Sequence, residues 1–173
     1  MDLSIFTSCA KRVSLPTLFL YADAKSSTVS HTFHHKGDER YKVRGENALR
    51  KFEGWVAFSE WNFKNKLLLL EAEFHYSMKN SSMAATCYEA SIEAAQKHKF
   101  INEEAISNEL AGLFFLEEGQ REKSLSFFER SAACCRTWGG FAVARRVESF
   151  TEKEFGIHIS QGIPSELTIN MAV

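Results

Sequence analysis

Three histidines near the N-terminus come closest in this sequence to a metal-binding pattern. His31, His34 and His35 are spaced so that, on a helix, their imidazoles would share one face and bind zinc or iron. The surrounding residues lack helical periodicity, however, and the next carboxylate downstream is Asp38. We therefore expect a solvated loop and predict no metal site. An enzyme built on this cluster is kept as an alternative, which zinc or iron retained in the purified protein would support.

Acidic and basic side chains offer two further candidate sites. Glu103, Glu104 and Glu109 are candidate acids or bases, but the first two fall in the first turn of an expected helix, where carboxylates stabilise the helix dipole. Arg145 and Arg146 are candidate ligands of phosphate or of an acidic partner. We interpret the glutamates as structural. The arginines are candidate partner contacts, with a solvated helix face as the simpler alternative.

Motifs of the common catalytic sites do not occur in the sequence. It contains no GxxxxGK[ST] phosphate-binding loop, no HRD or DFG of a protein kinase, no HExxH and no GxSxG. The sequence therefore predicts a protein that is not an enzyme, with no catalytic residues and no cofactor.

The composition is that of one globular domain. The chain has 173 residues, of which 45% are hydrophobic and 25% charged, and its net charge is -1. This balance predicts neither a nucleic-acid partner nor a membrane partner, and no stretch reaches the ~20 apolar residues of a membrane helix. Residues 13–22 resemble the apolar part of a signal peptide, but Pro16 interrupts them and Asp2 lies where a basic residue is expected.

The four cysteines indicate a reducing compartment. Cys134 and Cys135 are adjacent, a spacing that strains a disulfide, and no CxxC motif occurs. We expect reduced, buried thiols and a cytoplasmic protein.

The elements that position these residues are expected to be helices. Both prolines, Pro16 and Pro164, lie near the ends, and apolar residues recur between them at three- and four-residue steps. This pattern predicts an irregular segment over 1–43, a helical domain over 44–155 and a tail over 156–173. The expected helices cover about 44–60, 62–79, the residues from a break at 80–82 to 97, then 102–118, 120–137 and 141–155. Asn62 is an expected helix N-cap, the break Asn80-Ser81-Ser82 offers N-cap residues for the next helix, and Gly119 is an expected C-cap.

The sequence repeats itself at an offset of 40 residues. Small residues are matched to small ones, and aromatic residues are in most cases matched to aromatic ones. The pairs are Ala72 and Gly112, His75 and Phe115, Ala84 and Ser124, Tyr88 and Phe128, and Ser91 and Ser131. A hairpin of two helices packs closely where a small residue on one helix receives a ring from the other. The spacing resembles the tetratricopeptide pattern, although the period is longer than the usual ~34 residues. A generic helix bundle is the alternative, and both interpretations are all-α.

A second resemblance covers residues 62–150. It is carried by Tyr88-Glu89-Ala90, by residues 92–95, 100–105 and 108–111, by Gly119-Gln120 and by Trp138-Gly139-Gly140. These residues are similar to the tetratricopeptide-like helical region that follows the AAA-type ATPase module in large signalling kinases. Those proteins combine a Ser/Thr-kinase-like domain, an ATPase module, a GAF domain and often a histidine kinase. The family usually has Ala and a basic residue where this chain has Gly140 and Phe141. The matching residues form a packing motif and imply no catalytic chemistry.

Together these observations predict a non-catalytic helical-repeat scaffold for signal transduction. Its expected partner is a protein, either a peptide or helix in a groove or the neighbouring domains of a kinase. Trp55, Trp61 and Trp138 join the two arginines as candidate partner contacts. Two repeats bury little core, so we expect the module to depend on its first helix, on a neighbouring domain or on self-association. The alternative function is a fragment of a larger histidine or Ser/Thr kinase.

Overall fold

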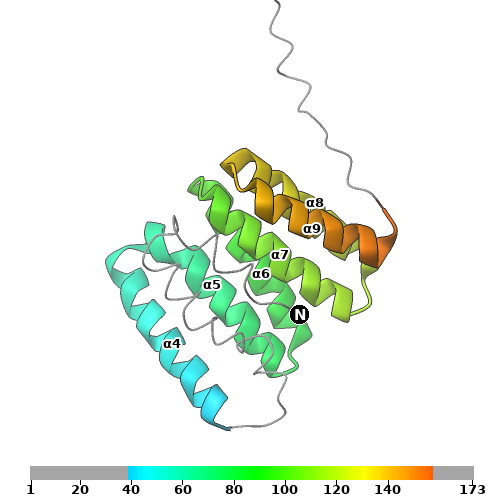
Figure 1. Ribbon diagram of the computed structural model, residues 1–173. Coiled ribbons are helices and arrows are strands. Elements are labelled where there is room, and N and C mark those ends of the chain that lie inside the picture. The colour runs from blue at the N-terminus through cyan, green and yellow to red at the C-terminus, as the bar shows by residue number, and fades with distance from the viewer. Residues whose placement is uncertain (1–38, 158–173) are drawn as a thin grey trace, which may run out of the picture.

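The computed structural model describes residues 39–157, and these residues form six α-helices joined by short corners (Figure 1). The helices are α4 (Glu39–Phe58), α5 (Glu60–Ser77), α6 (Ser81–Lys97), α7 (Ile101–Glu117), α8 (Arg121–Trp138) and α9 (Phe141–Phe155). No strand occurs in this part of the chain. The prediction of an all-α fold is thus confirmed for residues 39–157, whereas the histidines at 31–35 and most of the expected tail lie outside them.

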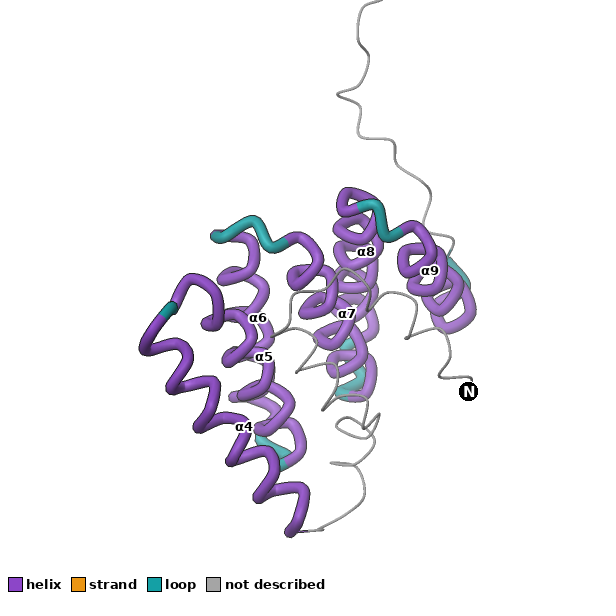
Figure 2. Tube along the Cα trace, turned by 60° about the vertical axis from the view of Figure 1, so that its left-hand side comes forward, coloured by secondary structure: helices purple, strands orange, loops and turns teal. Residues whose placement is uncertain are grey.

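Each helix packs chiefly on the helix before it and the helix after it (Figures 1 and 2). The chain reverses direction at every corner, so α5 with α6 and α7 with α8 are antiparallel hairpins. In addition, α5 contacts α7, the first helix of the next hairpin. We call α5, α7 and α9 the first-helix layer. Helix α7 contacts α5 on one side and forms an ion pair with α9 on the other.

The helix limits differ from the expected ones mainly at α4 and α5. Helix α4 begins at Glu39, five residues before the predicted start at 44. Ser59 rather than Asn62 precedes the first residue of α5. The Nδ2 of Asn62 donates instead to Ser59 Oγ at 3.0 Å, so this amide braces the corner from inside the helix. Asn80 does cap α6, because its side chain accepts a hydrogen bond from the N–H of Met83 at 3.4 Å.

The corners repeat one backbone geometry. At the α5–α6 corner Lys79 has φ 58° and the N–H of Asn80 donates to His75 O at 2.9 Å. At the α7–α8 corner Gly119 has φ 75° and the N–H of Gln120 donates to Phe115 O at 2.9 Å. A left-handed residue followed by this backbone bond ends a helix without exposing its last carbonyl groups.

Aromatic rings fill the space between the helices. One core cluster holds Tyr88, Phe114, Phe115 and Phe127, and the rings of Phe115 and Phe127 stack at 5.2 Å. Small residues face such rings where helices come close. A Cβ added to Gly112 would lie 3.0 Å from the Phe128 ring, so α7 and α8 pack at a distance that only glycine permits without rearrangement.

None of the helices within residues 39–157 combines the length and the apolar character that crossing a membrane requires.

Candidate functional site

A buried ion pair links α5 to α7 in the first-helix layer. Lys66 Nζ lies 2.7 Å from Glu103 Oε2, and the two side chains are only 6% and 8% exposed. Lys66 also donates to Asn62 O at 2.7 Å, and Asn65 Nδ2 donates to the same Glu103 oxygen. The Glu103 carboxylate thus receives two donors from α5, which makes it a cross-link between helices.

Two tyrosines donate to carboxylates in the same layer. Tyr76 OH donates to Glu117 of α7, and Tyr88 OH donates to Glu73 of α5. Burial, together with the charge of Glu73 and the bond to it, raises the pKa of Tyr88 well above its ordinary value of 10.0. Burial and the hydrogen bond to Glu117 raise the pKa of Tyr76 in the same way. Both hydroxyl groups therefore stay protonated and act as hydrogen-bond donors.

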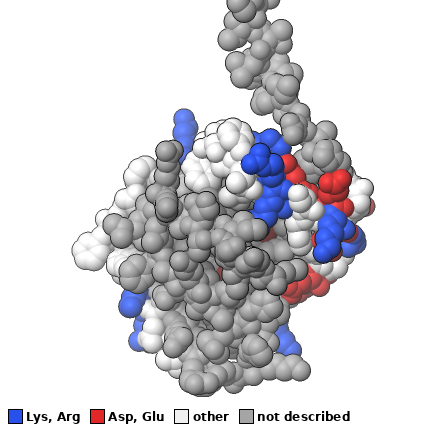
Figure 3. All heavy atoms as spheres, viewed as in Figure 1, with Lys and Arg blue, Asp and Glu red and all other residues white. Residues whose placement is uncertain are grey.

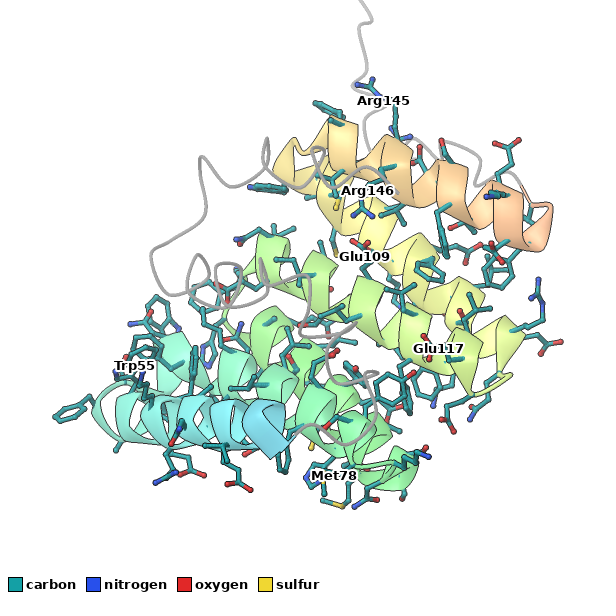
Figure 4. The ribbon with its side chains drawn as sticks, turned by 60° about the horizontal axis from the view of Figure 1, so that its bottom comes forward. Trp55, Met78, Glu109, Glu117, Arg145 and Arg146 are labelled. Atoms are coloured by element: carbon teal, nitrogen blue, oxygen red, sulfur yellow. The ribbon has the colours of Figure 1, made fainter. Side chains whose placement is uncertain are left out.

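Arg146 joins α9 to α7 through a two-pronged ion pair with Glu109. Its Nη1 and Nη2 each lie 2.7 Å from one carboxylate oxygen. Figure 4 shows Arg146 turned toward Glu109, whereas Arg145 points away from the helices. The two candidate arginines therefore differ, because Arg146 ties two helices together and Arg145 is exposed.

The three candidate tryptophans also differ in how far they are buried. Trp55 is partly buried and packs at 4.8 Å against Phe52 and at 5.6 Å against Phe63, so it is a packing residue. Trp61 is 53% exposed at the start of α5. Trp138 is partly buried at the end of α8, where a Cβ on Gly140 would come within 2.6 Å of its ring.

Two exposed rings were missed by the sequence analysis. Phe58 is 92% exposed at the end of α4, and Phe141 is 55% exposed at the start of α9. The repeat contained a signal for both. Positions 58, 98 and 138 are Phe, His and Trp, and positions 61, 101 and 141 are Trp, Ile and Phe, so the repeat keeps large ring or apolar side chains at both places.

The residues of the sequence repeat lie in the core with one exception. Each member is buried apart from His75, which is partly exposed with its ring 6.1 Å from that of Phe74. Serines among them bond to the neighbouring helix. Ser91 Oγ donates to Asn65 O and Ser131 Oγ donates to Ala105 O, both at 2.8 Å.

Burial raises the pKa of two of the thiols between residues 39 and 157. Burial and the neighbouring Glu104 raise the pKa of Cys134 to about 12, and burial raises that of Cys87. Cys87, Cys134 and Cys135 are free thiols. Within the same residues, no group of three or more His, Cys, Asp or Glu side chains is arranged to hold a metal ion.

The chain matches no protein family, no curated protein and no solved structure at a significant level. Its function is therefore inferred from the residues themselves.

Proposed function

We propose that this chain is a helical-repeat scaffold that binds a segment of another protein along its first-helix layer. The proposal begins with the repeat. The hydrogen bond from Ser91 to Asn65 O has its counterpart 40 residues later, from Ser131 to Ala105 O, with the same length of 2.8 Å. The corner bond from Asn80 to His75 recurs from Gln120 to Phe115. These matches support two copies of one hairpin, α5–α6 and α7–α8.

The tetratricopeptide-like character of the hairpins is part of the same proposal. It is supported by the contact of Gly112 with the Phe128 ring, which is the small-to-large contact that such hairpins use. In the first hairpin Ala72 and Tyr88 occupy the matching positions and share one core cluster. A period of 40 residues rather than ~34 makes this a lengthened form of the pattern.

The observation that carries the binding proposal is Leu113. This side chain is 36% exposed on α7, the middle helix of the layer. It lies four residues from Glu109 and four from Glu117, so the three share one helix face. Glu109 contacts α9 and Glu117 contacts α5. Leu113 is thus an apolar contact point between two polar cross-links, and helical repeats commonly bind extended peptides or helices with such surfaces.

Selection from a random peptide display library against the full chain tests this function. We expect selected peptides to bind the wild type and to lose about tenfold or more in affinity for Leu113→Lys, because a buried apolar contact becomes charged. Ala133→Lys is the matched control, since Ala133 is exposed on α8, outside the first-helix layer. Peptides that bind Leu113→Lys as tightly as the wild type would refute the proposal.

As a second candidate function, we propose that the module belongs to a signalling kinase of the type described above. The support comes from two polar residues of the resemblance, Glu103 and Asn108. They are only 7% and 0% exposed, so the packing of the helices constrains which residues can occupy these positions. Full-length transcripts provide the test. A reading frame that continues into ATPase, GAF or kinase sequences agrees with this proposal, and a frame coding only for this helical region contradicts it.

A further inference from the structure

A stripe of apolar side chains runs along the outer face of α7. Ile106 and Leu110 lie seven and three residues before Leu113, so the three share one side of the helix. Ile106 and Leu110 are partly buried against the core, and Leu113 is 36% exposed. A segment bound along the first-helix layer therefore meets an apolar surface on its middle helix.

The charged side chains around this stripe are already paired within the layer or with the helices beside it. The pairs are Lys66–Glu103, Glu73–Tyr88, Glu109–Arg146 and Glu117–Tyr76. Basic and acidic side chains are also interspersed over α8 and α9 (Figure 3). A charged occupant would lose its hydration here without gaining a surplus of opposite charge, so the surface suits an uncharged apolar segment.

The chain itself contains such a segment. Residues 13–22 include no Lys, Arg, Asp or Glu, and seven of these ten residues are Val, Leu, Phe, Tyr or Ala. They lie outside the described residues, as do residues 158–173. The latter are less apolar, since seven of their sixteen residues are Ala, Val, Ile, Leu or Met, and they include Glu166. Residues 13–22 are therefore the better match to the apolar stripe.

The connection to α4 is long enough to bring this segment to α7. Residues 23–38 form a linker of 16 residues between the segment and Glu39, where α4 begins. Helix α4 begins at the end of the array where α7 finishes (Figure 1). Helix α4 packs on α5, and α5 contacts α7, so the lateral distance is roughly 16–20 Å at about 8–10 Å per helix pair. A flexible linker of this length has a root-mean-square span of about 20–24 Å.

We propose that residues 13–22 bind along the first-helix layer over Leu113 and compete with the partner segment for this surface. The inference rests on the proposed binding function of the layer and adds its regulation. A linker whose span matches the distance gives the tethered segment an effective concentration in the millimolar range. A partner must displace the segment, so its apparent affinity falls by the fraction of molecules in which the surface is open.

Photo-crosslinking in the full chain tests where the segment lies. With p-benzoylphenylalanine in place of Leu113, we expect mass spectrometry to find links to residues 13–22. The same group in place of Ala133, which is exposed on α8 outside the layer, should give no such link. A mixture of unlabelled and ¹⁵N-labelled chains separates the two origins of a link, because links within one chain never combine both labels.

Competition with a fluorescent peptide of residues 11–25 tests the regulation. We expect the full-length variant L18S/L20S to bind this peptide on the order of tenfold more tightly than the wild type, because its own segment no longer occupies the surface. The matched control is I5S/F6S, which also replaces two apolar residues before α4 but leaves residues 13–22 intact, and it should bind like the wild type. Adding Leu113→Lys to L18S/L20S should remove the gain. Circular dichroism checks that every variant is folded.

The inference and the proposed function fail in different ways. Equal binding of the peptide by the wild type, L18S/L20S and I5S/F6S would overturn the inference, while display-selected peptides that depend on Leu113 would leave the proposed function standing. Display-selected peptides that ignore Leu113→Lys in both the wild type and L18S/L20S would overturn the proposed function as well. Crosslinks from position 113 that reach only residues 158–173, or only a second chain, would identify a different occupant and overturn the inference.

Discussion

At the scale of single residues, Gly112 fixes the distance between α7 and α8. A Cβ at this position would meet three atoms of the Phe128 ring at 3.0–3.1 Å. Phe128 has little room to move, because it is 1% exposed and packs at 5.2 Å against Phe150. We expect Gly112→Ala to lower the free energy of unfolding by about 1 kcal/mol, since the overpacking exceeds the helix propensity that alanine gains. Urea denaturation followed by circular dichroism measures the change.

Gly54 is the matched control for this substitution. It lies inside α4, and a Cβ there would meet nothing within 4 Å. Gly54→Ala should therefore stabilise the protein by about 0.5–1 kcal/mol. If Gly112→Ala stabilised the protein as much as Gly54→Ala, the close contact of Gly112 with Phe128 would be wrong.

Cys134 illustrates how surroundings suppress a reactive group. It is partly exposed, yet burial of the thiol and the nearby Glu104 raise its pKa to about 12. Only the thiolate reacts with iodoacetamide. We expect alkylation of Cys134 near pH 8 to be on the order of a thousandfold slower in the folded chain than in urea, as measured by mass spectrometry of peptides taken over time. Equal rates in the two states would show that the thiol is not held in its protonated form.

At the scale of the elements, the helices were largely predictable because the signals for them are local. Apolar periodicity, the Asn80 cap and the left-handed Gly119 depend only on near neighbours in the chain, and α9 has the expected limits. The first residues of α4 were missed, since residues 39–43 lack the apolar stripe of the helix that follows. The prediction of Asn62 as an N-cap was wrong, because Ser59, three residues earlier, already occupies the position before the first residue of α5.

The cross-link between α5 and α7 could not be predicted in this way. Glu103 was interpreted as a helix-dipole residue from its own helix, whereas its partner Lys66 lies 37 residues away. No local pattern specifies such a pair. The same holds for Tyr76 with Glu117 and for Arg146 with Glu109, because each depends on how two helices lie beside one another.

This cross-link gives a prediction at the element scale. Glu103→Ala removes the carboxylate beside a lysine that is 6% exposed. We expect a loss of about 3 kcal/mol in the free energy of unfolding, because a buried charge loses its ion-pair partner. Glu89→Ala is the control. It breaks an ion pair with Lys123 whose side chains are 50% and 43% exposed, and should cost less than about 0.5 kcal/mol. Similar losses for the two variants, by urea denaturation, would contradict the buried cross-link.

At the scale of the whole molecule, the buried acidic groups predict sensitivity to alkaline pH. Folding raises the pKa values of Tyr76, Tyr88, Cys87 and Cys134 above the ordinary 10.0 for tyrosine and 9.0 for cysteine. Below about pH 8 these groups are almost entirely protonated in both states and add little pH dependence. At higher pH the unfolded chain releases its protons first, so the free energy of unfolding falls.

Urea denaturation between about pH 8 and about pH 11 measures this fall. Tyr88→Phe should reduce its slope, because one of the four groups is then gone. A free energy of unfolding that stays constant over this range would contradict the raised pKa values.

The exposed rings of Phe58, Trp61 and Phe141 show what whole-molecule geometry adds to a sequence. Phe58 and Phe141 are 83 positions apart in the chain and each looks like one more apolar residue of a helix. Only the alternation of corners brings them to the same end of the array. Sequence reasoning selected Trp61 for its residue type, but it had no means of grouping that ring with the other two.

Because each helix packs chiefly on its neighbours in the chain, few contacts require distant segments to meet before the array can form. Low contact order of this kind favours fast folding, which can start in one hairpin and spread outward. The hairpin α7–α8 has the most extensive packing, whereas α4 and α9 each have their main contact on one side. We expect amide hydrogen exchange to be slowest in α7 and α8 and to speed up toward both ends of the array, so the molecule should unravel from its outer helices inward.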